Sequence, residues 1–296
     1  MGGGDMAAAA AQVRALLSAA RSVVVLTGAG VSAESGIPTF RGEGGWWRKY
    51  DATTLATPQA FARDPSSVWE FYHYRREVTA RCAPNPAHVA LAAFERRAAA
   101  EGRRFTLVTQ NIDRLHHDAG SRAVIELHGS LWDVVAATPG GGRDPATPPR
   151  EDRTQPLVPA LAGTGDPDGQ AADIPIEDLP HDGEGRLLRP GVVWFEEPLD
   201  DRVLDAVEEA LDGADLLLVV GTSSVVWPAA GFAPQVAARG VPVVEVNLEP
   251  TNNSAACTHS LQGRAGELLP GLLGVADEPD VAAAVAAAAR RRAQRV

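Results

Sequence analysis

The sequence is poor in cysteine, has no excess of positive charge and contains no long apolar run. Its 296 residues include two cysteines, Cys82 and Cys257. Two thiols cannot build a disulfide framework, and by themselves they cannot form a structural zinc site of three or four thiolates. The apolar runs are strand-sized, well below the ~20 residues that span a bilayer. We therefore expect a globular protein without a membrane partner.

The charge balance excludes another class of partner. The chain has 27 Lys and Arg against 38 Asp and Glu, a net charge of −11, and its body carries no stripe of basic residues. A phosphate backbone would be repelled, so no nucleic-acid partner is expected. Residues 1–17 lack the basic region, apolar core and cleavage site of a secretory signal. Together with the free thiols, this predicts a cytoplasmic location.

Apolar runs alternate with helix-like segments along the chain. Continuous runs of the kind found in parallel strands covered on both faces occupy 22–30, 105–113, 215–224 and 242–250. Helical patterns occupy 86–100, 200–212 and 228–238, and shorter strand candidates occupy 123–130 and 189–197. This order predicts an α/β fold with a Rossmann-like, doubly wound parallel sheet.

Two segments interrupt the alternation and predict a smaller inserted domain. Residues 46–84 are aromatic-rich and helical in pattern, whereas residues 133–187 are dense in Gly, Pro and Asp. Compact folds rarely hold a structureless loop of that length, so we expect a helical module and a loop module packed together. The Rossmann domain then comprises 1–45, 85–132 and 188–275, followed by an Ala/Arg-rich tail at 276–296.

Polar and Gly-rich clusters follow the predicted strands. Residues 28–33 read Gly-Ala-Gly-Val-Ser-Ala, a turn whose glycines let a pyrophosphate approach the backbone. Further clusters at 110–113, 128–130, 221–224 and 247–249 fall where an open α/β sheet forms its crevice. Each cluster alone could be a turn or a helix cap. The acidic residue that dehydrogenases carry about 20 positions after the turn is not evident, which disfavours that class.

His128 is the candidate general base of this crevice. A neutral imidazole can take a proton from a sugar hydroxyl. The alternative is that His128 is a structural residue, because most isolated histidines are. His116 and His117 follow the cluster at 110–113 on an expected helix start, and we assign them no role.

Six motifs follow one another along the chain: GAGVSAESGIPTFRG (28–42), TQNIDRLH (109–116), ELHGS (126–130), LRPGVVWF (188–195), VVGTSSVVWPAA (219–230) and VNLEP (246–250). In sequence and order they resemble those of the sirtuins, NAD-dependent protein-lysine deacylases. The resemblance implies that NAD and an acyl-lysine peptide enter a cleft between a Rossmann domain and a small domain. NAD would be consumed, giving nicotinamide, O-acyl-ADP-ribose and free lysine.

The resemblance also assigns residue roles. It implies catalytic roles for His128, which would deprotonate a ribose hydroxyl, and for Asn111, Asp113 and Arg41. The implied cofactor residues are Gly28, Ala29, Gly30, Ser32, Ala33, Glu34, Pro38, Thr39, Phe40, Arg41, Trp47, Gln110, Asn111, Ile112, Asp113, Gly221, Thr222, Ser223, Asn247, Leu248, Glu249 and Ala265. A substrate strand would lie between Val193, Trp194 and Phe195 on one side and residues 224–227 on the other.

Tyr72 and Arg75 are the candidate selectivity pair. They lie three residues apart, so on a helix they share one face, although an ordinary surface pair has the same spacing. The segment around them, VWEFYHYRREV (68–78), resembles the acyl-pocket helix of class III sirtuins, which implies selection of malonyl, succinyl and glutaryl groups. A guanidinium suits the terminal carboxylate of such groups because it can bind it through two hydrogen bonds.

The chain departs from the family pattern at two places. Glu196 stands where sirtuins usually have Gly, and no cysteine lies between residues 131 and 189, where they carry the two Cys pairs of a structural zinc. We therefore predict no metal. The alternatives that stay open are an NAD-dependent deacetylase, an ADP-ribosyltransferase or NADase on the same scaffold, and a silent NAD-binding module. The sequence predicts no oligomeric state.

Overall fold

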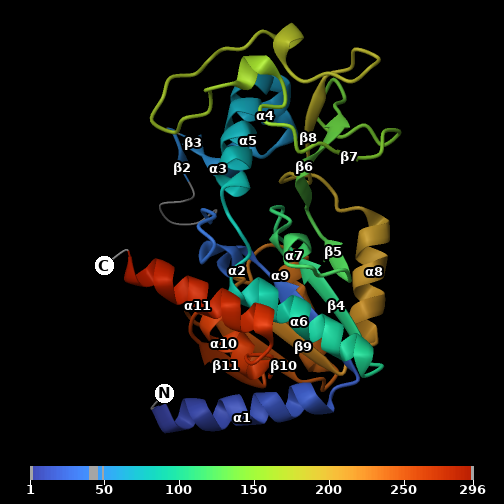
Figure 1. Cartoon of the computed structure of the whole chain (residues 1–296). Helices are drawn as coiled ribbons and strands as arrows, with labels where there is room; N and C mark the ends of the chain where they lie inside the picture. The colour runs from blue at the N-terminus through green and yellow to red at the C-terminus, as the bar shows by residue number, and fades with distance from the viewer. Residues whose placement is uncertain (1–2, 40–45, 49, 295–296) are drawn as a thin grey trace.

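A computed structural model describes residues 3–39, 46–48 and 50–294 of the chain. It has a larger part built on a sheet and a smaller part beyond the carboxyl ends of the strands (Figure 1). The six strands of the large sheet, all parallel, lie in the order β5 (Val124–Glu126), β4 (Arg104–Thr109), β1 (Ser22–Thr27), β9 (Leu216–Val220), β10 (Val243–Asn247) and β11 (His259–Gln262). This is the Rossmann order, so the predicted fold class is confirmed.

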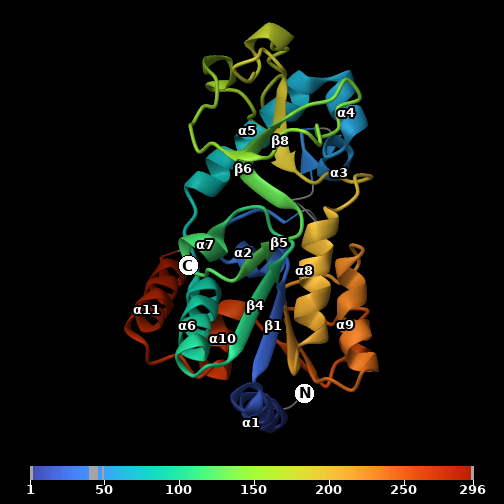
Figure 2. The same cartoon turned by 90° about the vertical axis from the view of Figure 1, so that its right-hand side faces the viewer.

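The continuous apolar strands are explained by helices on both faces of the sheet. Alternate residues of β1 enter two cores: Val23 and Val25 pack on one face, and Val24 and Leu26 on the other. The first face is covered by α1 (Gly3–Ala19), α6 (Pro86–Ala100), α10 (Ala265–Leu272) and α11 (Pro279–Ala293). The second face is covered by α8 (Asp201–Asp212) and α9 (Ala229–Ala238). Figure 2 shows these two helix layers on opposite sides of the sheet.

The strand order places a crevice above β1. From β1 the chain goes outward to β4 and β5, and it later returns to β9 on the other side of β1. The connections that follow β1 and β9 therefore run over opposite faces of the sheet, through α6 and α9 respectively. Ligands of open α/β sheets bind at such a point. The short helix α2 (Ala29–Ala33) begins here, and α7 (Leu115–Asp118) follows the loop after β4.

The small part combines helices from one inserted segment with strands from another. Its elements are β2 (Trp46–Trp47), β3 (Tyr50–Asp51), α3 (Ala52–Leu55), α4 (Pro58–Arg63), α5 (Pro65–Ala80), β6 (Gly129–Ala136), β7 (Arg150–Glu151), η2 (Pro159–Leu161), η3 (Ile176–Asp178) and β8 (Leu188–Val192). One apolar cluster joins them, with Trp69, Leu161 and Leu188 among its members. The side chain of Asp64 accepts a hydrogen bond from Ser67 N (2.9 Å) and so caps α5.

Several elements differ from the simplest expectation. The candidate strand 123–130 divides into β5 of the large sheet and the start of β6, and the candidate 189–197 is β8 of a three-stranded antiparallel sheet ordered β7-β6-β8. The edge strand β11 and the short η4 (Ser254–Ala256) were not predicted, because neither carries an apolar run. Among the described residues, no helix combines the length and apolar character needed to cross a bilayer.

Candidate functional site

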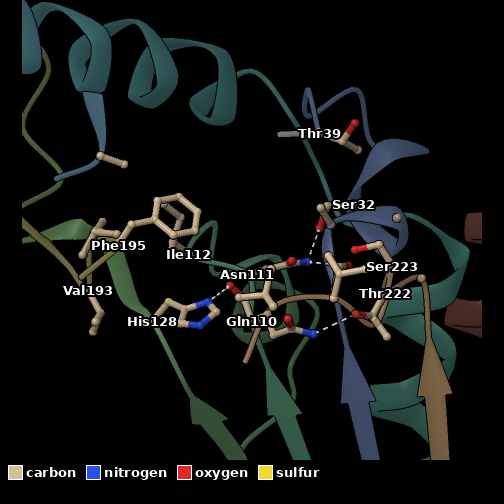
Figure 3. Close-up of a pocket in the computed structure, with 18 of the residues that line it drawn as sticks. Ser32, Thr39, Gln110, Asn111, Ile112, His128, Val193, Phe195, Thr222 and Ser223 are labelled. Carbon is tan, nitrogen blue, oxygen red and sulfur yellow. Dashed lines mark hydrogen bonds between the residues drawn. The ribbon is translucent and has the colours of Figure 1, made fainter. Parts of the chain in front are cut away.

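A cavity of about 1110 Å³ lies where the small part meets the crevice of the sheet. Most of the residues singled out by the sequence line it: Gly28, Ala29, Gly30, Ser32, Pro38, Thr39, Tyr72, Arg75, Gln110, Asn111, Ile112, Asp113, His128, Val193, Trp194, Phe195, Gly221, Thr222, Ser223, Asn247, Leu248 and Glu249. Figure 3 shows Gln110, Thr222 and Ser223 beyond the ends of neighbouring strands, Ser32 and Thr39 above them, and Val193 and Phe195 on the opposite side. Phe40 and Arg41 lie outside the described residues.

Two glycine turns meet at the floor of the cavity. A Cβ atom on Gly28 would lie 2.8 Å from the Thr222 Cα atom, and one on Gly30 would lie 2.7 Å from the Gly221 carbonyl oxygen. Gly30 N donates a hydrogen bond to that same oxygen (2.8 Å). Only glycine allows this approach, so the first turn of the motif is fixed against the loop after β9.

Side-chain amides connect the strand ends beside these turns. Gln110 Nε2 donates to Thr222 Oγ1 (3.0 Å), and Asn111 Nδ2 donates to Gly28 O and Ser32 Oγ, both at 3.1 Å. These bonds join the loops after β1, β4 and β9 without any charged group (Figure 3). The arrangement holds the polar wall of the cavity in one geometry before a ligand enters.

His128 is held as a neutral base. Its Nδ1 atom lies 2.9 Å from the carbonyl oxygen of Gln110, which can only accept, so Nδ1 carries the proton and Nε2 is left as the acceptor. Burial lowers the pKa of His128, and the bond to Gln110 opposes this shift only in part. At neutral pH the imidazole is therefore uncharged and able to take a proton.

Asp113 and Ser32 form a second polar group, supported from behind by His88. Asn85 N donates to His88 Nδ1 (3.3 Å), so His88 Nε2 is the donor to Ser32 Oγ (3.3 Å). Ser32 Oγ accepts from His88 and Asn111, which directs its own proton to the Asp113 carboxylate. Burial raises the pKa of Asp113 and lowers the pKa of His88 to about 3. Neither Asn85 nor His88 was singled out by sequence, although both begin a helix-like segment.

The Tyr72 and Arg75 side chains reach the cavity from α5. Tyr72 is fully buried, and its hydroxyl accepts a hydrogen bond from Trp194 Nε1 (2.7 Å). The Arg75 Cζ atom lies 5.6 Å from the Phe71 ring centroid and 5.7 Å from that of Tyr72. Burial lowers the pKa of the Arg75 guanidinium, with the Tyr72 hydroxyl and the Asp113 carboxylate opposing the shift. A cation is therefore held in a mostly apolar end of the cavity.

Arg189 and Glu197 position Trp194, and sequence reasoning gave them no role. Arg189 is fully buried and donates to both carboxylate oxygens of Glu197 (2.6 and 3.0 Å), while its Cζ atom lies 3.3 Å from the Trp194 ring centroid. Trp194 N donates to Glu197 Oε2 (2.8 Å). The available signal was an arginine inside an apolar strand, because buried arginines need a carboxylate or carbonyl partner.

The backbone near Phe195 restricts how a substrate strand can pair. Val193 N donates to His128 O (2.9 Å), Trp194 N to Glu197, and Phe195 N to Ala56 O (3.0 Å). Trp194 O accepts from Glu197 N (3.1 Å), so pairing with an added strand is left to the carbonyl oxygens of Val193 and Phe195. Glu196, the departure from the family pattern, has φ +69°, the left-handed region that favours glycine.

Four predicted cofactor residues lie off the cavity wall. Trp47 is 1% exposed in the core of the small part, where its Nε1 donates to Gly165 O (2.9 Å), so its position does not support a cofactor contact. Glu34 accepts from Gly266 N (2.8 Å) and ties α2 to the start of α10, the helix that Ala265 begins. Ala33 is the last residue of α2.

The residues in place of the family's zinc-binding segment do not fit a metal ion. In the turn around Asp182, the carboxylate accepts from Glu184 N, Arg186 N and Arg186 Nε, all within 2.9 Å. His181 Nδ1 bonds to Leu179 O (2.7 Å). The described residues include no group of three or more His, Cys, Asp or Glu side chains placed to hold a metal. Leu161, Leu179 and Ile174 instead fill the interior of this segment.

Curated relatives match most of the chain. The mitochondrial NAD-dependent protein deacylase sirtuin-5 of Xenopus tropicalis is 54% identical over 88% of this chain and 84% of its own length. The dog protein of the same name is 52% identical over 88% and 83%, and an NAD-dependent protein deacylase of Daphnia pulex is 52% identical over 87% and 93%. The predicted cytoplasmic location is wrong by this comparison, because the sirtuin-5 relatives are named mitochondrial. Free thiols do not distinguish one reducing compartment from another.

Solved structures agree with the fold. A Sir2 homologue in complex with NAD superposes with a TM-score of 0.75 and 40% identity, covering 93% of this chain and 94% of that one. A Sir2 complex with a p53 peptide and NAD gives a TM-score of 0.71 at 30% identity, with 89% and 96% coverage. The model of the Sir2 family matches residues 28–228, which include the glycine turn, the turn that holds His128 and the α5 helix. The chain belongs to the Sir2 family.

Proposed function

We propose that this protein, an NAD-dependent protein-lysine deacylase of the Sir2 family, acts preferentially on acyl groups that end in a carboxylate: malonyl, succinyl and glutaryl. The observation that carries the proposal is the pair on α5, in which the half-buried Arg75 and the buried Tyr72 supply a cation and a phenol at an apolar end of the cavity. The side-chain amides and hydroxyls at the strand ends supply no comparable positive charge.

The cofactor half of the cavity accommodates an extended dinucleotide. The backbone of Gly28 to Gly30 receives the pyrophosphate at the start of α2, and residues 221–223 and 247–249 receive the adenosine half. Asn111 and Asp113 face the nicotinamide and its ribose. NAD would supply an electrophilic ribose carbon at which the acyl oxygen would displace nicotinamide; addition of one water molecule would then free the lysine and leave the acyl group on ADP-ribose.

His128 moves the proton in this sequence. Its Nε2 atom is the unprotonated one, because Nδ1 donates to Gln110 O, so the ring takes a proton from a ribose hydroxyl without changing its tautomer first. Its lowered pKa keeps the ring neutral at physiological pH. Phe195 and Trp194 on one side and residues 225–227 on the other shield the acyl-lysine from water.

The terminal carboxylate of the acyl group would pair with Arg75. A guanidinium can hold it with two hydrogen bonds, and the buried Tyr72 hydroxyl, already fixed by Trp194, adds a third polar contact. An acetyl group offers no carboxylate and cannot form this pair with Arg75. The contact between Arg75 and the terminal carboxylate therefore discriminates malonyl, succinyl and glutaryl groups from the acetyl group.

Mass spectrometry of four matched peptides tests the proposal. Acetyl-, malonyl-, succinyl- and glutaryl-lysine versions of one peptide are incubated with NAD, with the His128→Ala variant as control. We expect the three acidic acyl groups to leave faster than acetyl, with one nicotinamide formed per lysine freed. Faster removal of acetyl would refute the acyl preference. Nicotinamide release without peptide would indicate an NADase. The absence of nicotinamide release under every condition would indicate a silent NAD-binding module.

A further inference from the structure

Glu245 is a buried carboxylate that the proposed chemistry does not use. It lies on β10 between β9 and β11, and the residue is 1% exposed. Three hydroxyl groups donate to it: Thr251 Oγ1 to Oε1, and Ser254 Oγ and Ser260 Oγ to Oε2, the last at 2.7 Å. A carboxylate can accept all three bonds at once, whereas an amide has only one acceptor oxygen.

Glu245 lies on the same strand and the same face as Asn247, a residue that lines the cavity. Side chains alternate along β10, so Glu245 and Asn247 project to the same face. Asn247 Nδ2 donates to Thr222 O (2.8 Å) and fixes the loop after β9. Glu245 fixes the loop after β10 through Thr251 and Ser254. Two residues of one strand therefore hold the two loops that flank the adenosine half of the cavity.

Besides the bonds to Glu245, the loop after β10 is tied to α9 by Asn253 Nδ2, which donates to Ala230 O (2.8 Å). Residues 248–252 line the cavity, but Leu248 is 59% exposed and buries little apolar surface. Within the loop, Thr251 N donates to Ser254 Oγ (2.7 Å) and Asn253 N to Thr251 Oγ1 (3.2 Å). Both hydroxyls that organise the loop are themselves bound to Glu245. The geometry of the cavity wall thus depends on a charge that lies behind it.

We propose that Glu245 is a positioning residue for NAD: through Thr251 and Ser254 it holds the loop after β10 in the conformation that receives the adenosine half. This inference rests on the proposed placement of NAD. Charge-assisted hydrogen bonds are about twice as strong as neutral ones, so the buried carboxylate is better suited to this task than a neutral acceptor.

Three variants of the full chain separate a positioning role from a structural one. Thr251→Val removes the loop-side hydroxyl, Ser260→Ala removes the strand-side hydroxyl outside the cavity wall, and Glu245→Gln alters the common acceptor. We expect Thr251→Val and Glu245→Gln to raise the KM for NAD about three- to tenfold. The KM for the acyl peptide and kcat at saturating NAD should stay within twofold. Ser260→Ala should leave the KM for NAD within twofold.

Calorimetric Kd values for NAD complete the experiment. A loss of kcat and Tm in all three variants, with an unchanged KM and Kd for NAD, would show that Glu245 only stabilises the fold and would overturn the inference. A wild-type protein that binds NAD but does not deacylate contradicts the proposed function alone, because the variants are still compared by Kd. A wild-type protein that does not bind NAD contradicts both.

Discussion

Replacing Arg75 by methionine tests the acyl specificity most directly. Methionine keeps the length of the side chain while removing the charge and the donors. Two charge-assisted hydrogen bonds to a carboxylate in a partly buried site contribute about 2–4 kcal/mol to transition-state binding. That loss corresponds to a fall of about 30- to 1000-fold in kcat/KM for a succinyl peptide. The acetyl peptide has no carboxylate, so its kcat/KM should change by less than about threefold.

The acetyl reaction also controls for a side effect of this variant. The Arg75 charge lowers the pKa of the buried Asp113, so its removal shifts that carboxyl further toward the protonated form. Any such effect appears equally with both peptides, and the ratio of their kcat/KM values isolates the acyl contact. Arg75→Lys, which keeps the charge but not the planar donor pair, should fall between the two proteins. An Arg75→Met protein with its succinyl/acetyl ratio intact would refute the reasoning.

Three further outcomes are expected. Because burial lowers the pKa of His128, kcat/KM should be level at neutral pH and decline only in acid, below the ordinary histidine pKa of about 6.5; a decline centred above pH 7 in a pH profile would contradict this. Chelator treatment should change neither Tm nor deacylation, and metal analysis finding one zinc per chain would overturn the prediction of a metal-free segment. Glu196→Gly should raise the free energy of unfolding by about 0.5–1 kcal/mol in urea titrations, since φ is +69°, and a destabilised variant would argue against that reasoning.

The fold was predictable because buried parallel strands have a simple signature. β1, β4, β9 and β10 are short continuous apolar runs, and helices cover them on both faces. β11, with the sequence His-Ser-Leu-Gln, pairs only on one side and has no such run. Edge strands of this kind depend on their neighbour for stability, so local sequence did not predict it.

The lining of the cavity was predictable where polar residues follow the ends of strands, and less so where tertiary contacts place the residues. Trp47 follows the glycine motif closely, and for that reason a cofactor contact was predicted. Its indole instead donates a hydrogen bond to the carbonyl oxygen of Gly165, which lies 118 positions further along the chain. The bond between Trp194 and Tyr72 joins residues 122 positions apart. Neither partnership leaves a local pattern, so the sequence gives the residue types of the pocket but not the contacts that orient them.

Helix α5 explains how the segment without zinc cysteines can be ordered and how it is connected to the acyl pocket. Glu70 on this helix is fully buried and accepts from Arg48 Nη2 (2.8 Å) and Ala172 N (3.1 Å). Arg76 donates to Leu131 O (3.0 Å) and Thr154 O (3.1 Å), and burial lowers its pKa to about 10, so it stays charged at neutral pH.

Arg75 and Arg76 are consecutive, and their side chains leave the helix about 100° apart. Arg75 therefore reaches the cavity, while Arg76 binds the loop segment and the β6 strand. The helix that carries Arg75, the proposed acyl-selective cation, is thus also the anchor of the segment in which sirtuins usually carry zinc cysteines. Chelator treatment should therefore leave acyl selectivity unchanged. A substitution of Arg76 that removes its hydrogen bonds to Leu131 O and Thr154 O should reduce both the order of the loop segment and the discrimination between succinyl and acetyl groups.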